Sequence, residues 1–99
     1  MTNEQRALIA TKLAGYEVQV SPAGKHYIID DDGIRPLVDF EKNWDESMTT
    51  FMAAMRVRDM TWQITRDCVI VDGVGVWNAL SRPLLSALAH CLLQIAEGE

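Results

Sequence analysis

Residues 39–65 read DFEKNWDESMTTFMAAMRVRDMTWQIT, and they hold the strongest structural signal in the chain. Asn43 is followed three residues later by Glu46, an arrangement that caps a helix and places acids where the helix dipole favours them. The large apolar residues that follow have helical spacing and share one face: Trp44, Met48, Phe51, Met52 and Met55. We therefore predict a helix from Trp44 to Arg58 whose apolar stripe faces inward.

A strand follows this helix directly. Trp62 and Ile64 alternate with Gln63 and Thr65, which is the period of a half-buried strand. We expect the stripe of the preceding helix to lie against an antiparallel sheet that contains Trp62. Helix and strand then form one helix-on-sheet unit.

The N-terminal residues predict another helix. Thr2 and Gln5 have the capping-box spacing, and Gly15 supplies a left-handed stop, so this helix spans about Asn3 to Ala14.

Strands are expected on both sides of the central unit. The alternation over residues 16–20 and the segment 26–30 predict two strands, with hairpin chemistry at Asp32-Gly33. Residues 34–38 form at best an edge strand, because Pro36 has no N–H to donate to a ladder.

Downstream, residues 68–71 and 74–77 predict two more strands. Arg66-Asp67 is expected to form the tight connection before them, and Asp72-Gly73 the hairpin turn between them. Ser81 is placed to cap a final helix that has Pro83 in its first turn.

The order of elements is therefore helix, strands, helix, strands, helix, with short turns and no long linker. We predict a single α+β domain over residues 1–99. Its mostly antiparallel sheet of about four to five short strands packs with three helices in a layered α/β/α sandwich.

Composition narrows the class of protein. The net charge of −5 argues against a duplex nucleic-acid binder, which needs a basic stripe to neutralise phosphates. The longest apolar-rich stretch, Leu84 to Ala96, is too short to span a membrane. Without a recognisable signal peptide, we expect a cytoplasmic protein whose two cysteines, Cys68 and Cys91, are reduced thiols.

Acidic clusters are the first candidates for chemistry. Residues 30–33, Asp-Asp-Asp-Gly, are interpreted as a hairpin turn, because Pro36 and apolar neighbours interrupt the spacing of a calcium loop. Four further acids surround a helix start, namely Asp39, Glu41, Asp45 and Glu46. They are interpreted as a solvated helix cap, although paired carboxylates also serve acid–base or metal chemistry.

Histidines and nucleophiles point to no reaction. His26 and His90 are interpreted as partly exposed framework residues, because a zinc site needs three or four converging ligands. No nucleophile elbow and no phosphate loop is present. We therefore predict a non-enzymatic protein with no catalytic residue, no metal and no cofactor.

One cluster is a candidate ligand site. Ser81 and the helix start after it offer free N–H groups, Arg82 adds a fork of donors, and Trp77 can stack on a base. The alternative is an ordinary capped helix with a surface arginine and a core tryptophan. Arg35 and Arg66 are possible further cations of the site, or else solvated surface charges.

Several of these features together resemble the phage ABA sandwich domain, a family of small proteins encoded by phages and prophages. They are Gly15-Tyr16, Phe40 with Asn43, the helix from Trp44 to Arg58 followed by Trp62, and the Ala- and Leu-rich run at 86–93. The resemblance covers roughly Glu4 to Ala96. It implies an αβα layered fold and a phage setting, and it carries no activity.

Three functions follow as expectations. The first is an interaction or counter-defence protein that blocks or tunes a host protein in the bacterial cytoplasm. The second is a sponge that sequesters a small anionic, nucleotide-type immune signal, and the third is an enzyme of unknown type. A symmetric homo-oligomer, by default a dimer, is expected because a core this small gains from association.

Overall fold

The structure is a computed structural model that describes residues 1–65, 68–71 and 84–98, together with the backbone of 74–78. Within these ranges the chain forms three helices and six strands. The helices are α1 (Asn3–Lys12), α2 (Trp44–Val57) and α3 (Leu84–Glu97). The strands are β1 (Glu17–Val20), β2 (His26–Asp30), β3 (Gly33–Pro36), β4 (Trp62–Ile64), β5 (Cys68–Val71) and β6 (Val74–Asn78).

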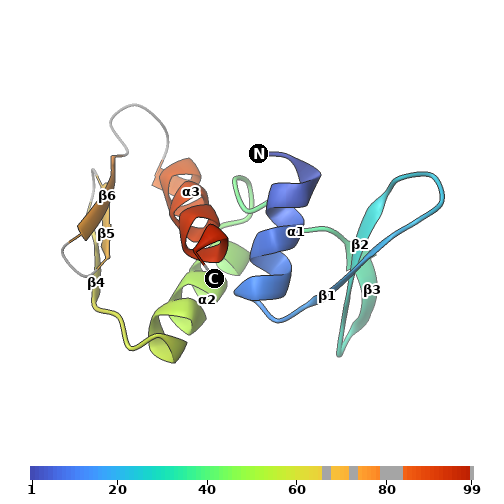
Figure 1. Ribbon diagram of the computed structural model, residues 1–99, viewed down its shortest axis with the longest axis horizontal. Helices are drawn as coiled ribbons and strands as arrows, with labels where there is room; N and C mark the ends of the chain where they lie inside the picture. Colours follow the sequence, from blue (N-terminus) through green and yellow to red (C-terminus); the bar gives the residue numbers. More distant parts are fainter. Residues whose placement is uncertain (66–67, 72–73, 79–83, 99) are drawn as a thin grey trace.

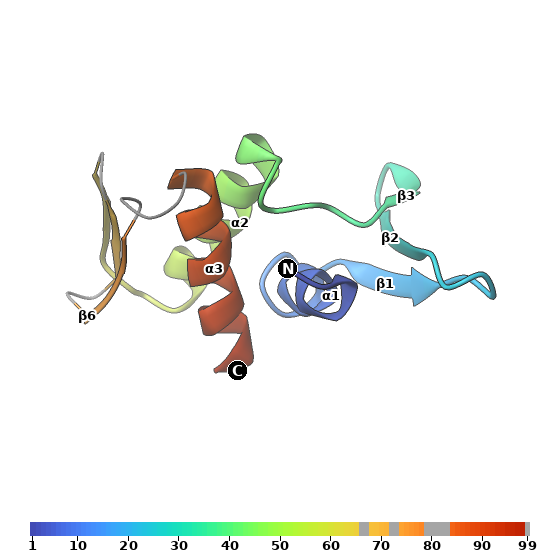
Figure 2. The ribbon, with the colours of Figure 1, turned by 90° about the horizontal axis from the view of Figure 1, so that it is seen from above.

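The helices lie in the middle of the molecule, between two small sheets at its ends (Figures 1 and 2). The described strands make two antiparallel three-stranded sheets, of order β1-β2-β3 and β4-β5-β6. On one side α1 packs against β1 and β2, and on the other α3 packs against β5 and β6, while α3 also contacts α1 and α2. The predicted α+β class is confirmed.

The arrangement of the strands differs from the prediction of one sheet of four to five strands within an α/β/α sandwich. Each sheet is a meander of consecutive strands, and α2 separates the two meanders in the sequence. Pro36 lies in β3, an edge strand, where it cannot donate to a further strand. Each sheet is instead covered on one face by a different helix, β1-β2-β3 by α1 and β4-β5-β6 by α3.

The predicted start of α1 is confirmed. Thr2 and Gln5 form a complete capping box, each side chain bonding the other residue's backbone N–H. The helix ends at Lys12, slightly before the predicted Ala14, and Gly15 adopts a left-handed φ of +73°.

The sheet β1-β2-β3 has distinct inner and outer faces. Val18, Ile28 and Arg35 lie opposite one another in the register and form the inner row, in which Ile28 is fully buried. Because side chains alternate along a strand, the neighbours Tyr27 and Ile29 belong to the outer face.

Helix α2 begins as predicted, with the Asn43 side chain accepting from the Glu46 N–H at 3.1 Å. Its buried face differs from the predicted stripe and consists of Ser47, Thr50, Phe51, Ala54 and Met55. Trp44 and Met52 are 44% and 43% exposed, so their predicted inward position is wrong, whereas Phe51 and Met55 are buried as expected. The reason is that α2 packs on α3. Two helices approach each other most closely where their side chains are small, and on α2 these are Ser47, Thr50 and Ala54, beside the predicted stripe.

Two contacts fix α2 in place. The buried Ser47 hydroxyl donates to the Phe40 carbonyl at 2.6 Å, which satisfies both groups and holds the fully buried loop aromatic. The ring of Trp62 in β4 lies edge-on to Phe51 with centroids 5.6 Å apart, although Trp62 is 42% exposed. The predicted helix-on-sheet unit is therefore wrong in its main contact: α2 packs on α3, and of the expected packing on the sheet the contact between Phe51 and Trp62 is present.

Helix α3 is the centre of the core. Its buried residues lie on most sides of the helix: Ala87, Leu88, Ala89, Cys91, Leu92, Leu93 and Ala96. A helix that contacts neighbours on several sides has to be apolar over most of its circumference. Cys91 and Cys68 are free thiols as predicted, and burial raises the pKa of the Cys91 thiol to about 12.

The C-terminal strands lie close to their predicted positions. β5 pairs with both neighbours, and the ladder to β6 carries a register irregularity at Ile70 and Val71. The predicted connections at Arg66-Asp67 and Asp72-Gly73, and the predicted cap at Ser81 with Pro83, lie outside the described residues. In the described part of the chain no helix has the length and apolar content needed to cross a membrane.

Candidate functional site

The ligand cluster predicted from the sequence falls mostly outside the described residues. Arg66, Ser81 and Arg82 lie outside, and of Trp77 only the backbone is described, in β6 opposite Val69. The nucleotide-type site at these residues therefore stays a prediction. Arg35 is the one member whose surroundings are described.

Arg35 holds two elements together. Its Nε lies 2.9 Å from Asp30 Oδ2 in β2, and its second terminal nitrogen lies 2.8 Å from Glu46 Oε1 in the first turn of α2. The guanidinium also stacks 5.2 Å from the centre of the Tyr16 ring, whose hydroxyl donates to Glu46 Oε2 at 3.1 Å. A bound anion would have to compete with both carboxylates, so the geometry describes a clamp between β3 and α2.

The electrostatics of the clamp are mutually stabilising. The hydrogen bond from Arg35 holds the pKa of the Asp30 carboxyl below its ordinary value, and Asp30 in turn raises the pKa of Arg35. Burial and the neighbouring Glu46 raise the pKa of Tyr16. The group is therefore a charged pair with a neutral phenol beside it across the usual pH range.

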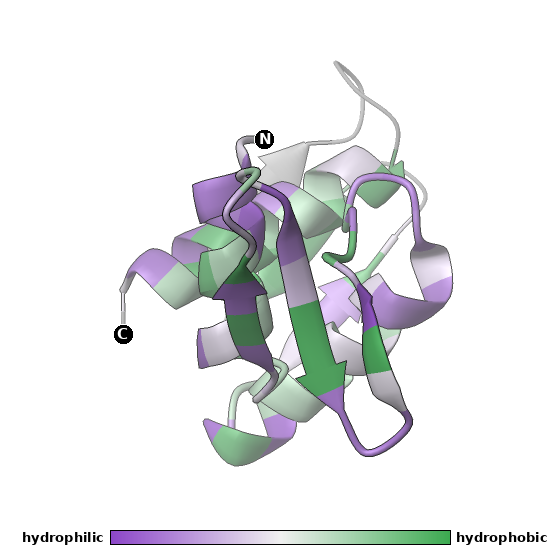
Figure 3. Cartoon of the chain, turned by 90° about the vertical axis from the view of Figure 1, so that its right-hand side faces the viewer, coloured by the Kyte–Doolittle hydropathy of each residue, from purple (hydrophilic) through white to green (hydrophobic). Residues whose placement is uncertain are grey.

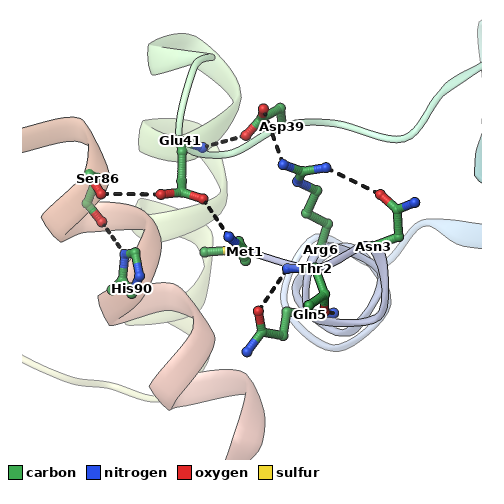
Figure 4. A network of polar contacts seen from close by, with 9 residues as sticks. All are labelled: Met1, Thr2, Asn3, Gln5, Arg6, Asp39, Glu41, Ser86 and His90. Carbon is green, nitrogen blue, oxygen red and sulfur yellow. Dashed lines mark hydrogen bonds and ion pairs between the residues drawn. The ribbon is translucent and has the colours of Figure 1, made fainter.

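A second polar network joins α1, α3 and the loop before α2 (Figure 4). Glu41 accepts from the Ser86 hydroxyl at 3.2 Å and pairs with the Met1 amino group at 3.1 Å. Burial opposes the charge on Glu41, but the amino group and the Ser86 hydroxyl outweigh it, and the pKa of Glu41 is lowered. Arg6 of α1 pairs with Asp39 in the same loop at 3.4 Å.

This network corrects the interpretation of the acids around the start of α2. Asp45 alone of the four is an exposed acid of the helix cap. Asp39, Glu41 and Glu46 each reach across to another element, which the sequence spacing did not indicate. Their role is to join elements that are distant in the sequence.

The network contains a serine, a histidine and a glutamate, yet its geometry is not that of a nucleophilic triad. Ser86 Oγ donates to Glu41, while His90 Nδ1 lies 2.7 Å from the Ser86 backbone carbonyl. The imidazole is therefore bonded to the backbone and does not contact the serine hydroxyl, as a general base would have to. His90 and His26 are half-buried framework side chains, as predicted.

The triple-aspartate segment is a turn. Asp30 Oδ1 accepts from the Asp32 N–H at 2.9 Å, and Gly33 follows with a φ of +119°. Among the described residues no group of three or more His, Cys, Asp or Glu side chains is placed to hold a metal ion.

Two apolar surfaces were not predicted. The first, here called the α2 surface, consists of Trp44, Met48, Met52 and Trp62. Three of its members are exposed by 42–44% and Met48 is half-buried. The spacing of the helical members, four residues apart, places them along one ridge of α2.

The second, here called the outer sheet face, is the exposed side of β1-β2-β3 (Figure 3). Its centre is an open hollow of about 340 Å³ lined by residues that include Val20, Tyr27, Ile29 and Ile34. Ile34 is 72% exposed. The sequence signal for this face is that Tyr27, Ile28 and Ile29 are consecutive, so apolar side chains point to both sides of β2. When Ile28 is buried on one side, Tyr27 and Ile29 are left on the other.

Comparison with known proteins finds no matching family model, no similar curated protein and no similar solved structure. The resemblance to the phage ABA sandwich domain therefore stays a prediction.

Proposed function

We propose that this chain is a non-enzymatic accessory protein that acts by binding another protein through the α2 surface. The phage or prophage setting, a counter-defence role and a target in the host cytoplasm come with the resemblance described above and belong to the same proposal.

The observation that carries this proposal is the exposure of Trp44 and Met52 on α2 and of Trp62 in β4, the strand that follows this helix. Trp44, Met52 and Trp62 keep more than two fifths of their surface in solvent in a chain whose other large side chains mostly find the core. Tryptophan and methionine are enriched where proteins bind one another, because they supply a large apolar area that adapts to a partner.

The charges along the ridge are mixed. Asp45 is exposed beside Trp44 at its start, and Arg56, four residues beyond Met52, is exposed at its end. We therefore infer a partner that presents an apolar pocket with a basic group at the Asp45 end and an acidic group at the Arg56 end.

Catalysis has less support. The serine, histidine and glutamate of the described polar network are hydrogen-bonded in a way that leaves no activated nucleophile. The sponge function rests on residues that are mostly undescribed, and Arg35 is engaged by two carboxylates.

The test is site-specific photo-crosslinking in bacterial cells. Met52 is replaced by p-benzoylphenylalanine, and the matched control carries the same residue at Val57, which is 80% exposed on the same helix. Because the two positions are about 140° apart around α2, they sample different faces. We expect one discrete adduct from position 52 that is absent from position 57.

A second step uses the purified partner identified from that adduct. The double variant Trp44→Ala, Met52→Ala should weaken its binding at least tenfold, roughly the loss of one hot-spot residue. The Val57→Ala variant should bind like the wild type. Equal adducts from both crosslinking positions, or unchanged affinity of the double variant, would contradict the proposal.

A further inference from the structure

The outer sheet face carries a row of side chains along β2 and at its two ends. Tyr27 and Ile29 of β2 point to the side opposite the fully buried Ile28. Lys25 lies directly before the strand, and Asp31 lies directly after it, in the turn. Lys25 and Asp31, at the two ends of the row, are both exposed. Read along the strand, the row is basic, apolar, apolar and acidic.

Three open hollows follow this row in sequence. Lys25 and Tyr27 line one of about 400 Å³, Tyr27 and Ile29 line the apolar one of about 340 Å³, and Ile29 and Asp31 line one of about 440 Å³. Neighbouring hollows share Tyr27 or Ile29, and the two outer hollows also reach Asn3 of α1 and the segment Gly15-Tyr16 after that helix. Only the middle, apolar hollow of these three is lined entirely by this sheet and the turn after β1. In Figure 3 the central strand of this sheet is hydrophilic at both ends and hydrophobic in the middle.

The flanking strands strengthen the pattern. Ile29 lies between Glu17 of β1 and Ile34 of β3 in the register. Glu17 therefore adds a second acid near the end that carries Asp31, and Ile34 widens the apolar middle. The face thus has an acidic end, an apolar centre and a basic end.

We propose that a second copy of this chain covers the outer sheet face in a two-fold symmetric dimer. A two-fold axis in the interface, perpendicular to β2 and passing at Ile28, sets Lys25 of one copy opposite Asp31 of the other. The same rotation sets Tyr27 opposite Ile29. In an isologous interface each contact occurs twice, so both ends of the row are neutralised and the apolar centre is covered.

The charges select this axis over the alternative. A two-fold axis parallel to the strands would place Asp31 against Asp31 and Lys25 against Lys25, which like-charge repulsion disfavours. Stacked sheets lie about 10 Å apart, so the side chains of the two rows interdigitate in the hollows.

The size of the face sets the strength of the dimer. The face comprises the outward side chains of three short strands, which is fewer than the roughly 20–30 residues a side of a stable interface, so we expect a weak dimer that forms at micromolar concentrations. Because the end contacts are exposed ion pairs, we expect dissociation to increase with salt.

Sedimentation equilibrium over a range of concentrations measures the association. The wild-type chain should approach twice its mass of 11.1 kDa at high concentration and low salt. Ile34→Asp should keep the mass of one chain, and its unchanged far-ultraviolet circular dichroism should show that the 72% exposed position leaves the fold intact. A wild-type monomer at several hundred micromolar, or a dimer that survives Ile34→Asp, overturns the proposal.

A charge exchange tests the axis. Lys25→Glu makes both ends of the face acidic, and the double variant Glu17→Lys, Asp31→Lys makes both ends basic. Each variant alone should associate at least tenfold more weakly than the wild type, and an equimolar mixture should regain the wild-type mass. If the mixture stays monomeric, or if each variant dimerises like the wild type, the proposed pairing is wrong.

The matched control is Glu4→Lys. Glu4 is exposed in the first turn of α1, whereas Glu17 follows the other end of that helix. Glu4→Lys changes the net charge as much as one of the exchanged acids does, away from the outer sheet face. It should dimerise like the wild type, and an equal loss would mean that net charge, not the pairing of ends, governs association.

Discussion

The sheets β1-β2-β3 and β4-β5-β6 are similar in size and topology, but they are attached to the helices by different forces. The C-terminal sheet is held by apolar burial, with Val69 and Val71 buried and Trp62 packed on Phe51. The N-terminal sheet packs the fully buried Ile28 and the partly buried Val18 against the core, and Arg35 adds an ion pair with Glu46 of α2.

This difference shows how a small chain divides its apolar residues. Hydrophobic burial is not directional, so β4-β5-β6 can be attached by packing its apolar residues against α3. An ionic clamp fixes orientation with few apolar contacts, and it leaves Ile29 and Ile34 of the other sheet on the outer side. The sheet that is clamped by charge therefore keeps apolar side chains on its outer face.

The largest effect is expected at the apolar attachment. Phe51→Ala removes a fully buried ring and the edge-on contact with Trp62. We expect the free energy of unfolding to fall by about 3–5 kcal/mol, measured by urea denaturation. Val57→Ala, at an 80% exposed position of the same helix, should stay within about 0.5 kcal/mol of the wild type. A small loss for Phe51→Ala would show that burial does not hold this side.

A smaller effect is expected at the buried residue of the N-terminal sheet. Ile28→Val removes one methylene from a fully buried site, and it should cost about 0.5–1.5 kcal/mol in the same urea experiment. Ile34→Val, the same change at a 72% exposed position of β3, provides the control and should have almost no effect. Equal losses at the two positions would mean that inner and outer faces are not distinguished.

The smallest effect, and the most specific, concerns the clamp. The folded-state pKa of Asp30 is below its ordinary value of 3.8, so its contribution to stability is present above that pH and is lost as the pH falls through the folded value. Arg35→Gln should return the pKa of Asp30 towards 3.8, as followed by carboxyl carbon shifts in an NMR titration.

When the pH is lowered from 4, the free energy of unfolding should fall less in Arg35→Gln than in the wild type. The reason is that the variant already lacks the contribution of the Asp30 carboxylate. Glu41 also has a lowered pKa and titrates in both proteins, so the difference between the two pH profiles isolates the clamp. Identical profiles, with an unmoved Asp30 titration, would contradict the assignment of the clamp as an attachment of this sheet.

Local features of this fold could be read from the residues alone. The Thr2–Gln5 box, the Asn43 cap and the turn at Asp30 to Gly33 each depend on groups within a few positions of one another. The ends of α2 and the position of β2 follow from the same short-range rules. Such interactions are the same whatever the rest of the chain does, so the sequence specifies them directly.

The candidate surfaces could be read only in part. The sequence shows which residue types form the α2 surface, since Trp44 and the methionines of α2 share one helical stripe. It does not show that they are exposed, because an apolar stripe of helical period is usually buried. The period also does not indicate which side of the stripe another helix will cover. The outer sheet face was missed for the same reason, since Ile34 has no periodic partner within β3.

The chain's own residues thus specified its helices, the caps of α1 and α2, the turn at Asp30 to Gly33 and its α+β class. The assembly of these parts specified the rest: two sheets around central helices, Arg35 meeting Glu46 of α2, and the side of α2 that remains in solvent. These outcomes depend on competition between alternative packings of distant segments, and the free energies that separate such packings are sums over many small contacts that no short stretch of sequence contains.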